Sequence, residues 1–167
     1  TSTSICFESP SRMIAPSPSP VVPLILTEQA GPVLTLTLNR PAKRNAINDP
    51  TVLELERIFT TLPSDVKCVV LAGAGEHFCA GLDLSELTER DVRQGIMHSM
   101  MWHRVFEKIQ FGPVPVVSVL KGAVIGGGLE IATATHIRVA EASAYYALPE
   151  GQRGIYVGGG ASVRLPR

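Results

Sequence analysis

The chain has 167 residues, enough for one ordinary domain, and apolar residues make up 45% of it. The 15 basic and 15 acidic side chains cancel, which argues against binding to nucleic acid or to an anionic membrane. Three cysteines without metal-type spacing argue against a disulfide scaffold and favour a reducing compartment. We therefore expect a cytoplasmic protein, or a mitochondrial one in a eukaryote, with no metal site.

Residues 1–23 differ in composition from the rest of the chain. They hold five of the 13 prolines, and the Ser-Pro alternation at Pro16–Pro20 is incompatible with a helix or a central strand. A single arginine and no long apolar run argue against a secretory signal or a mitochondrial presequence. The sequence thus predicts a disordered leader at 1–23 and a folded core at 24–167.

The core opens with a predicted β-hairpin. Leu24–Glu28 and Val33–Leu38 have strand patterns, the second with clean alternation, and Gly31-Pro32 marks the turn between them. Three further short apolar segments predict strands, at Lys67–Ala72, Val114–Leu120 and His136–Ala140.

Helices are predicted between these strands. Asn48, followed by an acid and a proline, is typical of a helix start, and that helix runs through Thr51–Leu62. Thr88 followed by Asp91 resembles a capping box for a helix that ends near Gln110. This helix carries an apolar stripe at Trp102, Val105, Phe106 and Ile109. A glycine turn and a helix follow at Gly126–Thr135, so the pattern predicts an α/β fold with mainly parallel later strands.

Three glycine-bearing stretches could carry chemistry, and none is a nucleotide-binding motif: Ala72–Leu84, Gly122–Glu130 and Pro149–Gly160. In the second, a strand leads through three glycines into a helix, which leaves free N–H groups that can hold a developing oxyanion. The alternative is that these glycines merely allow tight packing.

Glu130 and Glu150 are the acidic candidates in these stretches. Two carboxylates beside an oxyanion site would suit acid–base work on water. The alternatives are that Glu130 is a helix-capping acid and that Glu150 is a solvated loop residue.

Cys79 has a histidine two residues away, so a nucleophilic role is one hypothesis, and a small packing residue is the favoured one. His98 and His103 lack the spacing of a helical metal pair, which favours core packing or lining of a pocket.

Four motifs together resemble the crotonase family, the enoyl-CoA hydratase/isomerase superfamily. They are Asn39–Ile47, Phe78–Leu84, Gly126–Glu130 and Leu148–Glu150, in family order and at family-like spacing. The resemblance covers about Leu24 to Arg167. It implies a spiral of stacked ββα units that binds a coenzyme A thioester as substrate and needs no other cofactor.

The resemblance also implies the roles of individual residues. The two oxyanion-hole amides fall on Leu82 and Gly127, and the catalytic acids on Glu130 and Glu150. One acid would activate water and the other would deliver or receive the Cα proton. Seven residues would line the bound CoA thioester: Lys43, Asn45, Ala46, Ala80, Gly81, Asp83 and Gly126.

Because both acids are present, the resemblance favours hydration of 2-enoyl-CoA thioesters. The alternatives are an isomerase or a hydrolase of the same fold, or an inactive CoA-binding fragment. The family continues beyond the last residues of this chain, so we expect a chain that lacks the C-terminal helical region. A full-length protein would be a homotrimer or a homohexamer.

Overall fold

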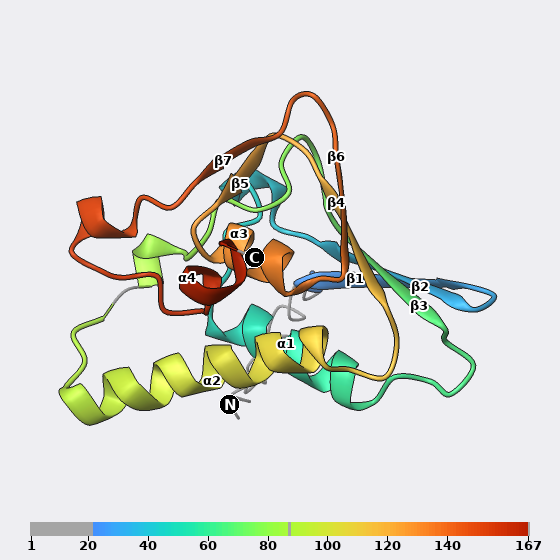
Figure 1. The fold of residues 1–167 in the computed structure, drawn as a ribbon, viewed down its shortest axis with the longest axis horizontal. Helices are drawn as coiled ribbons and strands as arrows, with labels where there is room; N and C mark the ends of the chain where they lie inside the picture. The colour runs from blue at the N-terminus through green and yellow to red at the C-terminus, as the bar shows by residue number, and fades with distance from the viewer. Residues whose placement is uncertain (1–21, 87, 167) are drawn as a thin grey trace, which may run out of the picture.

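Figure 1 shows the fold as a computed structural model that describes residues 22–86 and 88–166. Of the predicted leader at 1–23, only Val22 and Pro23 fall within these residues, so the predicted disorder lies outside them. The main sheet has five strands in the order β1 (Ile25–Ala30), β2 (Val33–Leu38), β3 (Cys68–Gly73), β4 (Val116–Leu120) and β6 (Ile137–Ala140).

The sheet begins with the predicted hairpin. Strands β1 and β2 are antiparallel, with Ala30 opposite Val33, and Gly31 takes the left-handed φ of +57° that the tight turn requires. Every later pair in this sheet, from β2–β3 to β4–β6, is parallel. The predicted parallel pairing of the later strands is therefore confirmed.

Two long helices, α1 (Asp49–Thr60) and α2 (Val92–Gln110), pack against each other (Figure 1). The predicted start of α1 is confirmed, because the Asn48 side chain accepts a hydrogen bond from the Thr51 N–H. The capping box predicted at Thr88 is wrong. The capping box is formed by Asp91 and Gln94 instead: the Asp91 carboxylate accepts the Gln94 backbone N–H, and the Gln94 side-chain oxygen accepts the Asp91 backbone N–H.

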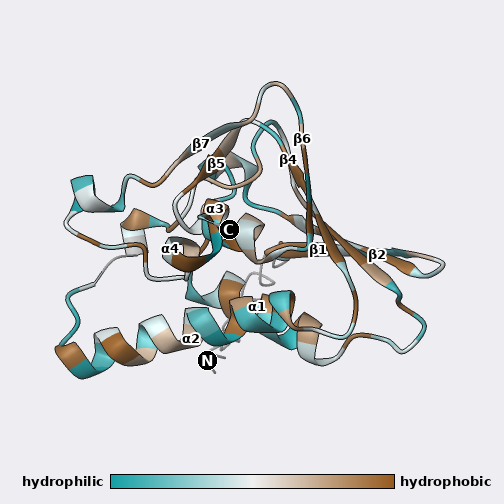
Figure 2. Ribbon diagram, viewed as in Figure 1, coloured by the Kyte–Doolittle hydropathy of each residue, from teal (hydrophilic) through white to brown (hydrophobic). Residues whose placement is uncertain are grey.

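The core lies between the main sheet and these helices. All four residues of the predicted stripe on α2 are buried, and α1 buries Val52, Leu55, Ile58 and Phe59 against it. Strand β2 buries alternate leucines, as its sequence pattern predicts. Figure 2 shows the strands of the main sheet mostly in the hydrophobic colour and the outer turns of α1 in the hydrophilic one.

A second, two-stranded parallel sheet was missed by the sequence analysis. It pairs β5 (Ala123–Ile125) with β7 (Tyr145–Ala147), and strands of three residues are too short to show a period. Helix α3 (Gly127–Ala134) follows β5 and contacts both this strand and α2, while α4 (Ala161–Arg164) packs on α3.

The chain order repeats two strands and a helix. The repeats run β1-β2-α1, β4-β5-α3 and β6-β7-α4, and the remaining strand β3 is followed by a bridging segment at Cys79 before α2. The first strands of the repeats join the main sheet, whereas β5 and β7 form the second one. Short 3-10 helices occupy three of the loops, at η1 (Pro41–Lys43), η2 (Leu84–Glu86) and η3 (Glu150–Arg153).

Within residues 22–86 and 88–166, no helix is long and apolar enough to cross a membrane. In the same residues no three His, Cys, Asp or Glu side chains gather as a metal site.

Helix α3 packs very closely on the bridging segment. A Cβ on Gly128 would lie 2.5 Å from the Cys79 carbonyl oxygen and 2.7 Å from the Cys79 Cβ, so only glycine fits there. The packing hypothesis for the three glycines therefore holds at Gly128.

Replacing Gly128 with alanine should strain this contact. Because the obstacle is backbone, we expect Gly128→Ala to lower the free energy of unfolding by about 3 kcal/mol, measured by urea denaturation. The matched control is Gly95→Ala in α2, where nothing lies within 4 Å of the new Cβ. The control should gain about 0.8 kcal/mol from helix propensity. An unchanged urea midpoint in Gly128→Ala would contradict the close contact.

Candidate active site

The segment Cys79–Asp83 is the centre of the candidate site, and it is paired on both sides. On one side Cys79 pairs in parallel with Val124 of β5. The Cys79 N–H donates to the Ala123 carbonyl at 2.9 Å, and the Cys79 carbonyl accepts from the Ile125 N–H at 3.0 Å. The segment thus extends the second sheet by one bridge.

On the other side Leu82 pairs in parallel with Ile47. The Ile47 N–H donates to the Gly81 carbonyl and the Ile47 carbonyl accepts from the Asp83 N–H, both at 2.8 Å. Since the neighbours of Leu82 make these bonds, the N–H of Leu82 points away from Ile47. It has no acceptor among the described residues, so this N–H is free for a ligand.

The second free amide belongs to Gly127, the first residue of α3. Gly126 before it has a φ of +53°, which glycine tolerates and which turns the chain sharply into the helix. As a helix N-terminal residue, Gly127 has an N–H with no intrahelical acceptor, and none is found among the described residues. A Cβ on Gly81 would lie 3.4 Å from the Gly127 nitrogen, so the two loops touch here.

Both amides and both predicted acids line one cavity of about 320 Å³. Leu82, Gly127, Glu130 and Glu150 all contribute to its wall, although they come from three separate parts of the chain. The structure therefore brings together the four residues to which the sequence assigned the chemistry. Their roles in catalysis remain predictions.

Glu130 is buried, at 4% exposure, and its carboxylate is partly satisfied by backbone. Its Oε1 accepts the Gly159 N–H at 2.6 Å and the Ala161 N–H at 3.4 Å. Burial raises the pKa of Glu130 above its ordinary value, and these two N–H groups oppose the rise. The Glu130 carboxylate therefore binds a proton more readily than the carboxylate of a solvated glutamate does.

Glu150, the first residue of η3, is buried at 8% exposure, so the alternative of a solvated loop residue is wrong. Its Oε2 has no hydrogen-bond partner among the described residues. A buried carboxylate oxygen without a partner is costly, and native structures rarely retain one without a reason. Glu150 lines the cavity, and its Oε2 lacks a hydrogen-bond partner that the described residues could supply.

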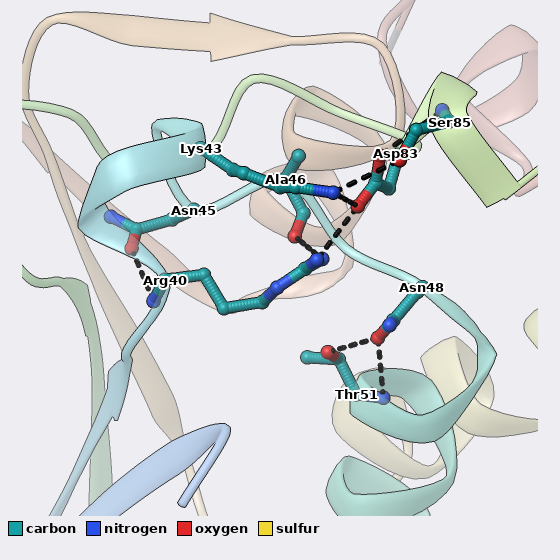
Figure 3. A network of polar contacts seen from close by, with 8 residues as sticks. All are labelled: Arg40, Lys43, Asn45, Ala46, Asn48, Thr51, Asp83 and Ser85. Atoms are coloured by element: carbon teal, nitrogen blue, oxygen red, sulfur yellow. Dashed lines mark hydrogen bonds and ion pairs between the residues drawn. The ribbon is translucent and has the colours of Figure 1, made fainter. Parts of the chain in front are cut away.

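A polar cluster holds the residue that follows Leu82 (Figure 3). The Asp83 Oδ2 accepts from Arg40 Nη2 at 2.7 Å and from Lys43 Nζ at 2.8 Å, while Oδ1 accepts from the Ser85 hydroxyl at 2.6 Å. The bonds from Lys43, Ser85 and Arg40 hold the pKa of Asp83 well below its usual range. The cluster fastens the loop of Leu82 to the segment 40–47.

Asn45 has an equally local set of contacts. Its side chain is buried, its Oδ1 accepts the Arg40 N–H, and its Nδ2 donates to the carbonyls of Ala74 and His77. All the bonding capacity of this amide except one lone pair is used within the protein. Its side chain is therefore a clamp between two loops.

None of the seven residues predicted to line CoA contributes to the wall of this cavity: Lys43, Asn45, Ala46, Ala80, Gly81, Asp83 and Gly126. They lie in the segments that flank Leu82 and Gly127. Contacts of these residues with CoA stay a prediction, and they would have to be made outside the cavity.

The opposite wall of the cavity comes mostly from residues that the sequence analysis gave no site role. Arg90 and four residues of α2 contribute to it, together with five residues of the loop after η3: Gly95, His98, Ser99 and Trp102, then Gly154, Ile155, Tyr156, Gly158 and Gly159. His98 and His103 were both expected to pack in the core or to line a pocket, and His98 lines this cavity whereas His103 does not. The apolar stripe of α2 was the only signal that could have pointed to Trp102.

Cys79 is a packing residue. It is fully buried, and burial raises the pKa of its thiol to about 12, so the thiolate is absent at neutral pH. The neighbouring His77 uses its Nδ1 to accept the Ala123 N–H at 3.1 Å. The hypothesis of a nucleophilic Cys79 is therefore wrong.

The cluster at Asp83 predicts a pH-dependent stability. Because the pKa of Asp83 is lowered by folding, its stabilisation is full above the unfolded value of about 4 and is lost as the pH falls below it. Asp83→Asn replaces the carboxylate that Arg40 and Lys43 share by a neutral amide and should cost about 2 kcal/mol at pH 7. Its melting temperature should fall less steeply in acid than that of the wild type.

The control for Asp83→Asn is Glu54→Gln, which removes the carboxylate of an exposed ion pair with Arg57. Its effect at pH 7 should stay below about 0.5 kcal/mol. Equal melting temperatures of Asp83→Asn and Glu54→Gln at pH 7 would show that the cluster does not stabilise the fold.

Comparisons with known proteins agree with this architecture. The family model described as enoyl-CoA hydratase/isomerase matches residues 28–167. The short-chain-enoyl-CoA hydratase of Clostridium acetobutylicum is 36% identical over 146 residues, which cover 86% of this chain and 56% of that protein. The chain thus spans about half the length of the curated relatives it matches.

Solved structures share the fold. A crystal structure from Rhodopseudomonas palustris CGA009 is 63% identical with a TM-score of 0.85, covering 86% of this chain and 56% of that one. An enoyl-CoA hydratase from Bacillus anthracis is 32% identical with a TM-score of 0.80, covering 87% and 58%. By sequence and by fold, this chain belongs to the enoyl-CoA hydratase/isomerase family, with the crotonase fold that its motifs predicted.

Proposed function

We propose that the cavity hydrates 2-enoyl-CoA thioesters, by addition of water across the double bond next to the thioester carbonyl. The observation that carries this proposal is the presence of two free amides and two buried carboxylates in one cavity. Family membership supports an acyl-CoA substrate, since the matching family model and several relatives are named for enoyl-CoA hydration.

The amides of Leu82 and Gly127 would bind the thioester oxygen. When a hydroxyl group adds to the β-carbon, negative charge moves through the former double bond to that oxygen and an enolate forms. Two preorganised N–H donors stabilise such a charge without having to reorient. Each donor is fixed by backbone pairing or by a helix start, so the geometry does not depend on side-chain rotamers.

The carboxylates of Glu130 and Glu150 would exchange the protons. Addition of water needs a base that takes a proton from the water and an acid that gives one to the α-carbon. The unpartnered Oε2 of Glu150 and the raised pKa of Glu130 suit these two tasks. A carboxyl group whose pKa has moved toward neutrality both gives and accepts a proton more readily near pH 7.

Isomerisation of 3-enoyl-CoA is the second candidate. One carboxylate is enough to carry a proton from the α-carbon to the γ-carbon, and Glu150 has the free oxygen for it. A relative from Zymoseptoria tritici, 34% identical over 145 residues, is named an enoyl-CoA isomerase/hydratase. Two assays separate these candidates. One measures hydration of crotonyl-CoA through the loss of absorbance of the conjugated thioester, and the other measures isomerisation of 3-hexenoyl-CoA.

Replacing either acid by its amide should separate chemistry from binding. Glutamine keeps the size of the side chain but cannot exchange a proton, so Glu130→Gln and Glu150→Gln should each lower kcat for crotonyl-CoA by about 10²- to 10⁴-fold. The double variant should lose less than the product of the single effects, because the two residues act on one water. Glu28→Gln on exposed β1 is the matched control and should keep wild-type turnover.

The affinity for a saturated acyl-CoA should change little in both active-site variants, because the amides are intact. Wild-type turnover in Glu130→Gln would assign that carboxylate to structure alone. Wild-type turnover in both variants would exclude the proposed proton transfers by the two carboxyl groups.

A further inference from the structure

Polar side chains reach one wall of this mostly apolar cavity, on α2 and on the residues just before it. His98, Trp102 and Arg90 line it, and behind them all three side chains contact one carboxylate, that of Asp49. Its Oδ1 lies 2.6 Å from His98 Nε2 and accepts from Trp102 Nε1 at 3.3 Å, while Oδ2 accepts from Arg90 at 3.5 Å. None of these groups is needed for the proton transfers assigned to Glu130 and Glu150.

The contact with Asp49 occupies one ring nitrogen of His98 and leaves the other for a ligand. Because a carboxylate only accepts, Nε2 carries a proton toward Asp49, and the neutral form of such a ring has its lone pair on Nδ1. Among the described residues Nδ1 has no hydrogen-bond partner, while the His98 side chain is only 21% exposed. Trp102 packs at a ring distance of 5.8 Å from His98 and fixes its place along the helix.

Arg90 adds donors to the same wall. Its contact with Asp49 is at the outer limit of a hydrogen bond, and a guanidinium carries five N–H donors. A purely hydrocarbon acyl chain would remove water from Arg90 and His98 and give nothing back, which costs binding free energy. An oxygen atom on the acyl chain would replace that water.

We propose that the substrate's acyl group carries an oxygen substituent, a hydroxyl or a carboxylate, which is bound by His98 and Arg90. A hydroxyl donates to His98 Nδ1, and either kind of oxygen accepts from Arg90. Asp49 is a positioning residue that holds both side chains. This proposal deepens the proposed function, on which it rests, by naming the substrate class of that site.

The test measures binding alone. Its reporter is Trp102, the single tryptophan of the sequence, which lines the cavity. Its fluorescence is titrated with three saturated thioesters that cannot be hydrated: hexanoyl-CoA, 6-hydroxyhexanoyl-CoA and adipoyl-CoA. We expect at least one oxygenated thioester to bind about tenfold more tightly than hexanoyl-CoA, as expected for one or two satisfied hydrogen bonds.

Two variants assign the preference to residues and distinguish the two oxygen groups. His98→Leu should abolish the preference for 6-hydroxyhexanoyl-CoA, and Arg90→Met should abolish the preference for adipoyl-CoA. Met100→Leu is the matched control, since Met100 lies on α2 with 58% exposure, away from the cavity wall, and it should keep the wild-type ratios. Asp49→Asn should reduce both preferences without changing the affinity for hexanoyl-CoA more than a few fold.

The wild type alone can overturn the proposal, so the test does not depend on the folding of any variant. Equal or tighter binding of hexanoyl-CoA overturns it, as does the absence of acyl-CoA binding. Preference without hydration of any 2-enoyl-CoA would reject the proposed function and leave the acyl class standing. Hydration without preference would do the reverse.

Discussion

The segment Cys79–Asp83 is held between two neighbours, and the rest of the site depends on this constraint. Parallel bridges to Val124 and to Ile47 leave it no freedom to rotate, so the Leu82 N–H can only face away from Ile47. Gly128 packs so closely on Cys79, at one end of this segment, that a Cβ would not fit there. At the other end, Arg40 and Lys43 hold the Asp83 carboxylate. A backbone amide whose chain is held in this way is a preorganised donor for a ligand.

Burial of two carboxyl groups is the second feature of the candidate site. Glu130 and Glu150 are both less than 10% exposed, and α3 and η3 bring them to one cavity beside the two amides. Removal from water raises the pKa of Glu130, and the backbone N–H groups of Ala161 and Gly159 oppose that rise.

Local signals made much of this fold predictable. The hairpin at β1–β2, the start of α1 and the buried stripe of α2 each rest on residues a few positions apart, which the sequence displays directly. Strands β5 and β7 have three residues each and are defined only by pairing across the fold, so their sequences show no hydrophobic periodicity that would predict them. The acid three residues after Thr88 predicts a cap at Thr88, whereas the helix is capped by Asp91, whose capping-box partner is Gln94.

The candidate site was predictable as far as its motifs reach. Glu130, Glu150, Leu82 and Gly127 came from the motifs, but the partners of single charges did not. Lys43 and Asp83 were both assigned to CoA, while the structure pairs them with each other across 40 residues of sequence. His98 and Asp49 are likewise 49 positions apart, and only tertiary packing brings them into contact.

Amide chemical shifts test the central claim most directly. With ¹⁵N-labelled protein, the backbone N–H resonances of Leu82 and Gly127 are followed while hexanoyl-CoA is added. The account predicts that both protons move downfield, because each forms a new hydrogen bond to the thioester oxygen, while the Ile47 and Asp83 amides, already bonded, change little. Saturation with hexanoyl-CoA that leaves the Leu82 and Gly127 resonances unchanged would contradict it.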